Sequence, residues 1–336
     1  MELLHDTLGF AAKGFVVFLT IVATVSVIIM LSRRRRLALP RLEVKPLNAR
    51  FEALGDALRH SVLERKQLKA LSKERKREKK APPPDKKHVY VLDFDGDLLA
   101  IGVVSLREEI NAITAVARPE DEVVVRLESP GGGVPHYGLA AAQLARLREK
   151  KVKLTVCVDR VAASGGYMMA CVADRIVAAP FAIIGSIGVV AQVPNLNRLL
   201  KKHDVDFEEM TAGEYKRTVS LFGEITEKGR QKFSEQLEET HVLFKDFVKS
   251  QRPGLDVAKV ATGEYWLAKR ALELGLVDQL STSDDYLLSR VADAQLYQVR
   301  FRPEENWRRR IGNASAEILE RTVVNVLSRM QSLQLR

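Results

Sequence analysis

Residues 122–133 read EVVVRLESPGGG and decide the fold, because they join an apolar strand pattern to a sharp glycine turn. The run of valines predicts a β-strand. Glycines after it allow positive φ angles and bring backbone N–H groups close to a ligand. Residues 134–150, VPHYGLAAAQLARLREK, then place Leu139, Leu144 and Leu147 among apolar positions of a predicted helix. A strand, a turn and a helix in this order indicate one unit of an α/β sheet.

The same alternation continues on both sides of this unit. The stretches VYVLDFDG (89–96), VKLTVCVD (152–159) and DRIVAAP (174–180) predict strands, and helical patterns such as EEINAITAVA (108–117) lie between strands. Strands separated by helices indicate right-handed crossovers and a mainly parallel sheet. We therefore predict an α/β domain over residues 88–290.

Residues 176–194, IVAAPFAIIGSIGVVAQVP, carry no charge and could be taken for a membrane-spanning helix. Pro180, Gly185 and Gly188 interrupt the run. Short apolar runs bounded by glycine and proline favour buried strands, and we predict strands here.

Residues 1–32 are predicted to be an N-terminal membrane anchor. Residues 14–32, GFVVFLTIVATVSVIIMLS, form an uncharged run of 19 residues, which is about the length of a transmembrane helix. A cleavable signal peptide would have a shorter apolar core and a small-residue cleavage site, so we favour an uncleaved anchor. Arg33–Arg36 follow at once, and the positive-inside rule then predicts a single-pass protein of the cytoplasmic (inner) membrane with its C-terminal part in the cytoplasm.

The net charge of +10 comes from one segment. Residues 33–87 hold 19 Lys and Arg against 7 Asp and Glu, whereas the rest of the chain has a net charge of −2. This distribution argues against a nucleic-acid-binding protein. Residues 33–87 are predicted to be a basic helical connector, whose helix ends at Pro82–Pro84. The connector could be a solvated linker, or it could contact anionic lipid headgroups through its basic residues, including Arg33–Arg36.

Residues 291–336 are predicted to be an amphipathic tail that packs on its own domain or on a partner subunit. Cys157 and Cys171 lie in apolar runs, which favours two buried free thiols over a disulfide. The cysteine and histidine spacings indicate no metal site.

Three segments contain residues that could carry out catalysis. SPGGG at 129–133 could supply half of an oxyanion hole, although a glycine turn after a strand is common. AASGGY at 162–167 places Ser164 before a helix, where it could be a nucleophile or a helix N-cap. GEYK at 213–216 contributes Lys216, which alone would be a surface lysine, but a buried lysine can act as a base.

These three segments, in the order in which they occur, resemble the signal peptide peptidase A and SohB family, and most closely its SohB branch. Two further segments, GSIGV at 185–189 and WLAKRALELGLVD at 266–278, also fit this family. The resemblance spans residues 89–280. It implies a ClpP/crotonase-like fold, a homo-oligomer, polypeptide substrates in extended form and no cofactor.

The resemblance also implies that Ser164 attacks the substrate, that Lys216 takes the serine proton, and that the N–H groups of Gly132 and Gly165 bind the oxyanion. Gly131 is a supporting residue, and Ser186 is a candidate for orienting Lys216. His136 and His203 are the alternative bases near these segments. Two other functions stay open at this point: an acyl-CoA enzyme of the crotonase type, which needs no Ser/Lys pair, and a catalytically silent membrane scaffold.

Overall fold

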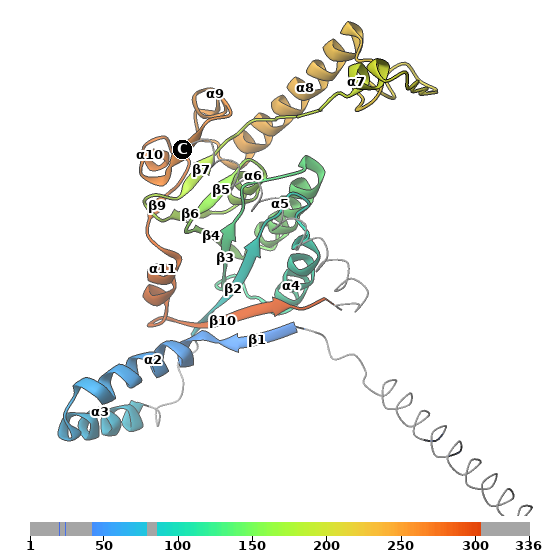
Figure 1. The fold of residues 1–336 in the computed structure, drawn as a ribbon. Coiled ribbons are helices and arrows are strands. Elements are labelled where there is room, and N and C mark those ends of the chain that lie inside the picture. Colours follow the sequence, from blue (N-terminus) through green and yellow to red (C-terminus); the bar gives the residue numbers. More distant parts are fainter. Residues whose placement is uncertain (1–19, 21–23, 25–41, 79–85, 304–336) are drawn as a thin grey trace, which may run out of the picture. The chain divides into compact units, whose positions relative to one another are not determined.

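A seven-stranded sheet forms the centre of the chain (Figure 1). The computed structural model describes Thr20, Thr24 and residues 42–78 and 86–303. The strands of this sheet are β1 (Leu42–Pro46), β2 (Lys87–Asp95), β3 (Glu122–Glu128), β4 (Lys153–Val158), β6 (Arg175–Ala178), β9 (Gln279–Leu280) and β10 (Ala294–Phe301). Their order is β1-β10-β2-β3-β4-β6-β9, and all neighbours are parallel except β1 with β10. The predicted α/β fold with a mainly parallel sheet is confirmed.

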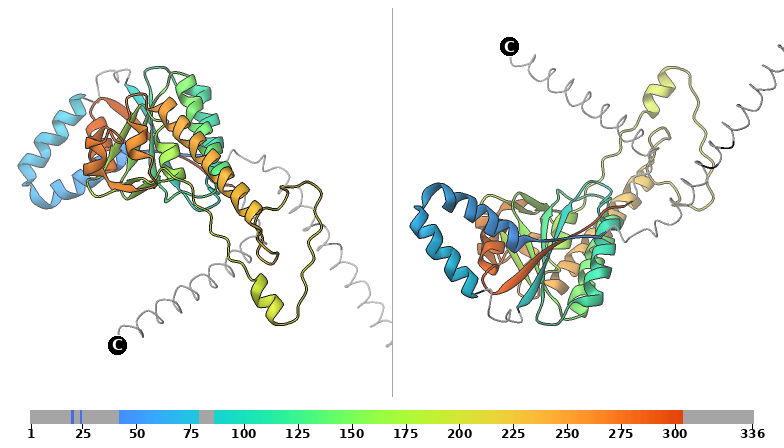
Figure 2. Two further views of the ribbon diagram at one scale, coloured as in Figure 1. Left: turned by 90° about the horizontal axis from the view of Figure 1, so that it is seen from above. Right: turned by 90° about the horizontal axis from the view of Figure 1, so that it is seen from below.

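Helices lie on both faces of the sheet (Figure 2). The helices of the described residues are α2 (Leu47–Val62), α3 (Arg65–Glu78), α4 (Val103–Val116), α5 (Val134–Glu149), α6 (Gly165–Ala170), α7 (Asn197–Lys202), α8 (Glu227–Gln251), α9 (Val257–Val260), α10 (Ala268–Glu273) and α11 (Ser283–Arg290). Of these, α7 lies away from the sheet (Figure 1). Alternate residues of β2 explain the two layers. Leu92 and Phe94 pack with α4 and α5, whereas Val89 and Val91 pack with α2 and α11. Burial of each such side chain contributes roughly 1.5–3 kcal/mol.

A second sheet of three strands lies next to the first. It consists of β5 (Val161–Ala163), β7 (Ile183–Gly185) and β8 (Tyr265–Leu267), in that order. The apolar run 176–194 therefore contributes strands β6 and β7, and the prediction of strands rather than a membrane-spanning helix is confirmed for these residues.

Two strands come from segments that the sequence analysis placed outside the 88–290 domain. β1 lies in the predicted basic connector and β10 lies in the predicted tail, and the two pair with each other from Leu42–Phe301 to Pro46–Tyr297. Side chains from the helices fix β10: Asn48 of α2 accepts a hydrogen bond from the N–H of Leu296 (2.7 Å). Their pairing depends on contacts across more than two hundred residues, which local sequence patterns do not reveal.

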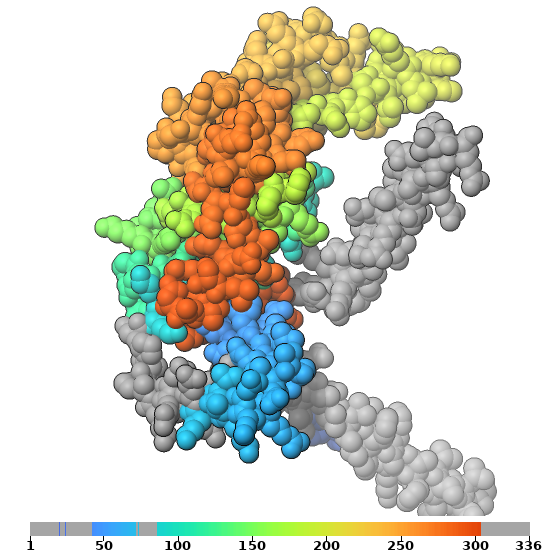
Figure 3. Space-filling view, turned by 90° about the vertical axis from the view of Figure 1, so that its left-hand side faces the viewer, coloured from blue at the N-terminus to red at the C-terminus, as the bar shows by residue number. Residues whose placement is uncertain are grey.

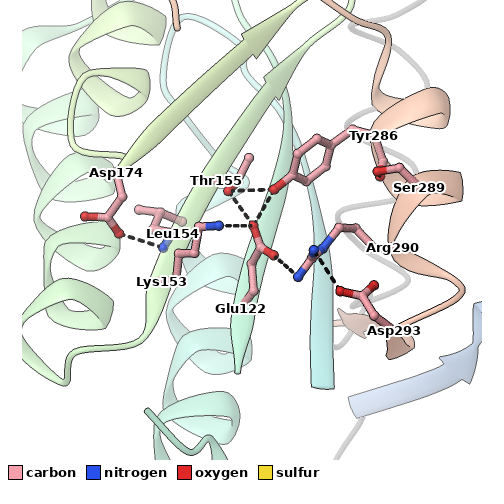
Figure 4. A network of polar contacts seen from close by, with 9 residues as sticks. All are labelled: Glu122, Lys153, Leu154, Thr155, Asp174, Tyr286, Ser289, Arg290 and Asp293. Carbon is pink, nitrogen blue, oxygen red and sulfur yellow. Dashed lines mark hydrogen bonds and ion pairs between the residues drawn. The ribbon is translucent and has the colours of Figure 1, made fainter. Parts of the chain in front are cut away.

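A buried polar network joins the beginnings of β3 and β4 to α11 (Figure 4). Glu122 is 2% exposed and accepts hydrogen bonds from Thr155 Oγ1 (2.6 Å) and Tyr286 Oη (2.5 Å). Lys153 Nζ and Arg290 Nη2 lie 3.6 Å and 3.2 Å from its carboxylate oxygens. Burial raises the pKa of Tyr286 to about 12, so this hydroxyl keeps its proton and donates. The network stabilises the end of the sheet that lies away from the turn at residues 129–133.

Apart from Thr20 and Thr24, the predicted anchor at 14–32 lies outside the described residues, as do the arginines at 33–36 and the part of the tail beyond residue 303. Among the residues that the structure does describe, no helix has both the length and the apolar character needed to span a membrane.

Candidate active site

Ser164 occupies a strained turn between β5 and α6. Its φ of 52° and ψ of −118° place a non-glycine residue in the left-handed half of backbone space. Such a conformation costs about 1–3 kcal/mol, so the surrounding structure must hold it in place. The N–H of Ser164 donates to Gly185 O (2.7 Å), and its carbonyl accepts from Met168 N (2.9 Å). A half-buried serine on a sharp strand-to-helix turn has the typical setting of a hydrolase nucleophile.

The glycine turn packs directly against Ser164. Ser129 pairs with β5, because its N–H donates to Val161 O (2.9 Å) and its carbonyl accepts from Ala163 N (3.0 Å). Gly131 has a φ of +95°, and a β-carbon there would lie 2.7 Å from Ser164 Cβ. Only glycine permits both this conformation and this approach. The structure therefore brings Ser164 and the 129–133 turn together, as the sequence led us to expect.

Two backbone N–H groups remain available beside Ser164. In the glycine turn, the N–H of Gly131 donates to Ser129 Oγ (3.1 Å) and that of Gly133 donates to Leu98 O (2.9 Å). Within the described part of the chain, the N–H of Gly132, between them, has no acceptor. The N–H of Gly165, the first residue of α6, has none among the described residues either. Gly165 follows Ser164 directly, and Gly132 follows Gly131, which packs on Ser164. Two unpaired backbone amides in such a setting are the kind of donor that an oxyanion requires.

Ser186 lies one residue beyond the carbonyl that binds Ser164 N–H. It has a φ of +50°, its N–H donates to Glu264 O (2.8 Å), and its hydroxyl donates to Gly263 O (3.3 Å). Ser186 is thus linked to the nucleophile through the hydrogen bond of its neighbour Gly185, and its hydroxyl contacts a carbonyl of the loop before β8.

Lys216 lies in a different place. We call residues 188–226 the arm; the arm carries α7 and leads into α8 (Figure 1). Lys216 is exposed, and its N–H donates to Gly213 O (3.1 Å) in a turn of the arm. Among the contacts of the described residues, no hydrogen bond or ion pair joins Lys216 to Ser164. Within the described part of a single chain, the glycine turn therefore lies against Ser164, whereas the predicted base makes no contact with it.

The other candidate bases are two histidines, and the other candidate nucleophiles are two cysteines. His136 is exposed in the first turn of α5, where a β-carbon on Gly133 would lie 2.7 Å from its Nδ1, so this histidine borders the glycine turn. His203 is exposed at the end of α7 on the arm. Cys157 and Cys171 are buried and free, as predicted. Burial raises the pKa of the Cys171 thiol to about 12 and also raises that of Cys157, so neither thiol forms a thiolate nucleophile at neutral pH.

Tyr137 is a residue of this region that the sequence analysis did not single out. It is fully buried, and its hydroxyl lies 2.6 Å from Ser129 Oγ, beneath the glycine turn. In the sequence, a tyrosine in a helix indicates only a core position. The one feature of the sequence that could have indicated a place near the site is that Tyr137 follows the last glycine of the turn by four residues.

Comparison with known proteins identifies the family. Residues 146–297 match the model for peptidase family S49, and residues 2–144 match the model for the N-terminal part of the same family. The chain belongs to peptidase family S49. This S49 chain is a serine-type peptidase, and its substrates are polypeptides. The predicted membership of the signal peptide peptidase A and SohB family is confirmed, and the acyl-CoA enzyme and the silent scaffold are set aside.

Two of the curated relatives of this peptidase are similar along nearly all of their own length. The probable protease SohB of Haemophilus influenzae is 48% identical over 97% of this chain and 96% of its own. The probable protease SohB of Buchnera aphidicola subsp. Schlechtendalia chinensis is 47% identical over 86% of this chain and 100% of its own. Among solved structures, a 1510-N membrane-bound stomatin-specific protease with a substrate peptide has a TM-score of 0.42 at 15% identity, covering 69% of this chain and 99% of that one.

Proposed function

We propose that this peptidase cleaves polypeptides with Ser164 as nucleophile, Lys216 as general base and the N–H groups of Gly132 and Gly165 as oxyanion donors. The observation that supports this most is the strained turn at Ser164, which packs on Gly131 and is followed directly by the unpaired amide of Gly165. No other described serine combines these features with a turn between a strand and a helix.

The proposed reaction needs no cofactor. The neutral amine of Lys216 takes the proton of Ser164 Oγ as this oxygen attacks the scissile carbonyl. The carbonyl oxygen becomes negatively charged and is held by the two amides. Lys216 then gives its proton to the leaving amine, and an acyl-enzyme forms at Ser164. Water, deprotonated by the same lysine, hydrolyses the acyl-enzyme and restores Ser164.

We further propose that Ser164 and Lys216 come from two copies of the chain. Hydrogen bonds of the arm run within the arm or to the start of α8: Leu196 N donates to Leu221 O (2.7 Å), Lys201 Nζ donates to Glu224 (2.9 Å), and Glu214 pairs with Lys228. From residue 188 to residue 243 no residue is fully buried. The arm thus has a free surface on which Lys216 lies exposed, and a neighbouring copy can receive it.

The apolar surface of the arm supports an assembled form. Large apolar side chains on it are 37% or more exposed: Val190, Val193, Leu196, Leu199, Val205, Phe207, Met210, Tyr215, Leu221 and Phe222. Figure 3 shows the arm (yellow-green) beside α8 with its outer side uncovered in this view. Many exposed apolar side chains on one segment are typical of a protein–protein interface. The loop before α4, with Leu98 and Leu99 at 74% and 57% exposure, contacts the glycine turn and offers a partner surface next to Ser164.

Mixing two inactive variants tests this arrangement. Ser164→Ala and Lys216→Ala should each be inactive, whereas their co-assembly from equal amounts should restore about a quarter of wild-type activity. Each site then needs an intact serine and an intact lysine from adjacent subunits, and each is present with a probability of about one half. Cleavage of unfolded casein by co-expressed, co-purified full-length chains provides the measurement.

The control pairs Ser164→Ala with the double variant Ser164→Ala/Lys216→Ala, in which no site can be complete. If both mixtures are inactive although the chains co-purify as one oligomer, the two residues do not come from different copies.

We also propose that residues 14–32 anchor the peptidase in the inner membrane and that Arg33–Arg36 keep the peptidase domain on the cytoplasmic side, where it acts on extended segments near the bilayer. The support is the uncharged run followed by four arginines. Alkaline phosphatase, which is active only outside the cytoplasm, should give no signal when fused to the C-terminus. Strong phosphatase activity would place the domain on the other side.

A further inference from the structure

Two buried hydroxyl groups lie directly beneath the glycine turn. Ser129 and Tyr137 are both 0% exposed, and their side-chain oxygens are 2.6 Å apart. Tyr137 Oη also lies 2.8 Å from the carbonyl oxygen of Asp97, and Ser129 Oγ lies 3.1 Å from the N–H nitrogen of Gly131. The four groups form one chain of contacts that runs from the loop after β2 to the turn beside Ser164.

The direction of each hydrogen bond follows from whether each group can donate a proton or only accept one. The Asp97 carbonyl can only accept, so the single hydroxyl proton of Tyr137 is donated to it. The hydroxyl proton of Ser129 is then donated to Tyr137 Oη, and a lone pair of Ser129 Oγ accepts the N–H of Gly131. Burial raises the pKa of Tyr137, in keeping with a phenol that stays protonated. Every proton in the chain has one acceptor, so the arrangement is fully determined.

This chain of hydrogen bonds decides which amide of the turn is free. Ser129 Oγ engages the N–H of Gly131, and Leu98 O engages that of Gly133. The N–H of Gly132, between them, is left for a ligand. Without the hydroxyl of Ser129, the peptide units on either side of Gly131 lose the contact that orients them, and glycine has little intrinsic resistance to rotation.

Tyr137 also touches the other side of the site. A β-carbon at Gly165 would lie 2.4 Å from Tyr137 Cγ, so the ring packs against the residue that carries the second free amide. The hydroxyl pair itself fills the space beside Gly96, where a β-carbon would lie 2.3 Å from Ser129 Oγ and 2.4 Å from Tyr137 Oη. One side chain thus contacts Gly165 through its ring and the glycine turn through its hydroxyl.

We propose that Tyr137 and Ser129 are positioning residues of the peptidase, which set the spacing and direction of the Gly132 and Gly165 amides around the developing oxyanion. They touch neither substrate nor the reacting atoms and act only through the two amides. The inference rests on the proposed function, in which these amides bind the oxyanion.

Tyr137→Phe tests the inference, because it keeps the ring against Gly165 and removes only the hydroxyl. We expect kcat for an internally quenched casein-derived peptide to fall about tenfold or more, while KM changes less than about twofold, because the lost contact matters in the transition state. Ser129→Ala should give a loss of similar size. The double variant should be little worse than either single one, since both interrupt the same chain of hydrogen bonds.

A peptide aldehyde separates positioning from a purely structural role. The aldehyde forms an oxyanion on Ser164, so its inhibition constant should rise by the same factor by which kcat/KM falls. Tyr167→Phe is the matched control: Tyr167 is also fully buried, and its hydroxyl donates to Leu276 O (3.0 Å) instead of to the glycine turn. It should lower Tm to a similar extent and leave kcat and aldehyde inhibition unchanged.

The positioning role would be overturned if Tyr137→Phe kept the kcat and the aldehyde inhibition of the wild type. If Tyr137→Phe fails to fold, the same result in Ser129→Ala would overturn it. In that event, an inactive Ser164→Ala protein in the same assay would show that the proposed function still holds. Continued cleavage by Ser164→Ala would overturn the proposed function and the positioning role with it.

Discussion

Ser164→Ala is expected to abolish polypeptide cleavage, and Lys216→Arg is expected to be as inactive as Lys216→Ala. Loss of the nucleophile or the base of such a unit lowers kcat by roughly four to six orders of magnitude. An arginine keeps the positive charge and much of the length of the side chain, but a guanidinium does not release its proton at working pH. The double variant Ser164→Ala/Lys216→Ala should be no worse than either single one, because the two residues act together. The activity of all four variants (the three single substitutions and the double one) is measured as the initial rate of cleavage of a casein-derived peptide.

Lys202→Arg is the control for the lysine substitution. Lys202 is another exposed lysine of the arm, at the end of α7, and its replacement should leave activity within about twofold of wild type. Substantial cleavage by Lys216→Arg would rule out Lys216 as the base and would direct attention to His136 and His203.

Gly165→Ala is expected to cause the second-largest loss. The added methyl group would lie 2.4 Å from Tyr137 Cγ and 2.8 Å from Tyr137 Cβ, atoms of a fully buried side chain with no room to move. The Gly165 amide must then shift away from the oxyanion position, and we expect kcat to fall at least about a hundredfold. Overpacking should also lower the free energy of unfolding by about 1–3 kcal/mol. Kinetics and thermal unfolding of the same sample separate the two effects.

Gly138→Ala is the matched control for this substitution. Gly138 lies in α5 next to Tyr137, and nothing lies within 4 Å of an added β-carbon there. An alanine in a helix is favoured over glycine by roughly 0.5–1 kcal/mol, so Tm should rise slightly and activity should be retained. Full activity in Gly165→Ala would remove the Gly165 amide from the oxyanion site.

The local parts of the fold and of the site could be predicted from the sequence. The strand before Ser129, the glycine turn and Ser164 each lie within a few residues of a strong signal: an apolar run, a glycine cluster or a small-residue motif. The contact of Ser164 with Gly131 was expected from the resemblance to a known family, and in the structure it results from the parallel pairing of Ser129 with β5.

Features that depend on distant contacts could not be predicted in this way. The GEYK motif singled out Lys216, but no local pattern reveals that the arm has no buried residue and keeps this lysine away from Ser164 within one chain. Tyr137 has the same helical pattern as its core neighbours, and its role is visible only where its hydroxyl meets Ser129. β1 is short and partly charged, so its pairing with β10 cannot be deduced from residues 42–46 alone.

The place of β10 in the sheet has a consequence for how the chain folds as it leaves the ribosome. β2 is an inner strand between β3 and β10, yet β10 is translated roughly 200 residues after β2. At about 5–20 residues per second, the outer edge of β2 stays open for roughly 10–40 s of synthesis. During this time an apolar strand with unpaired N–H and C=O groups is exposed to other nascent chains. Nascent-chain chaperones are therefore needed most before Ala294 emerges, because the sheet closes only after β10 has been made.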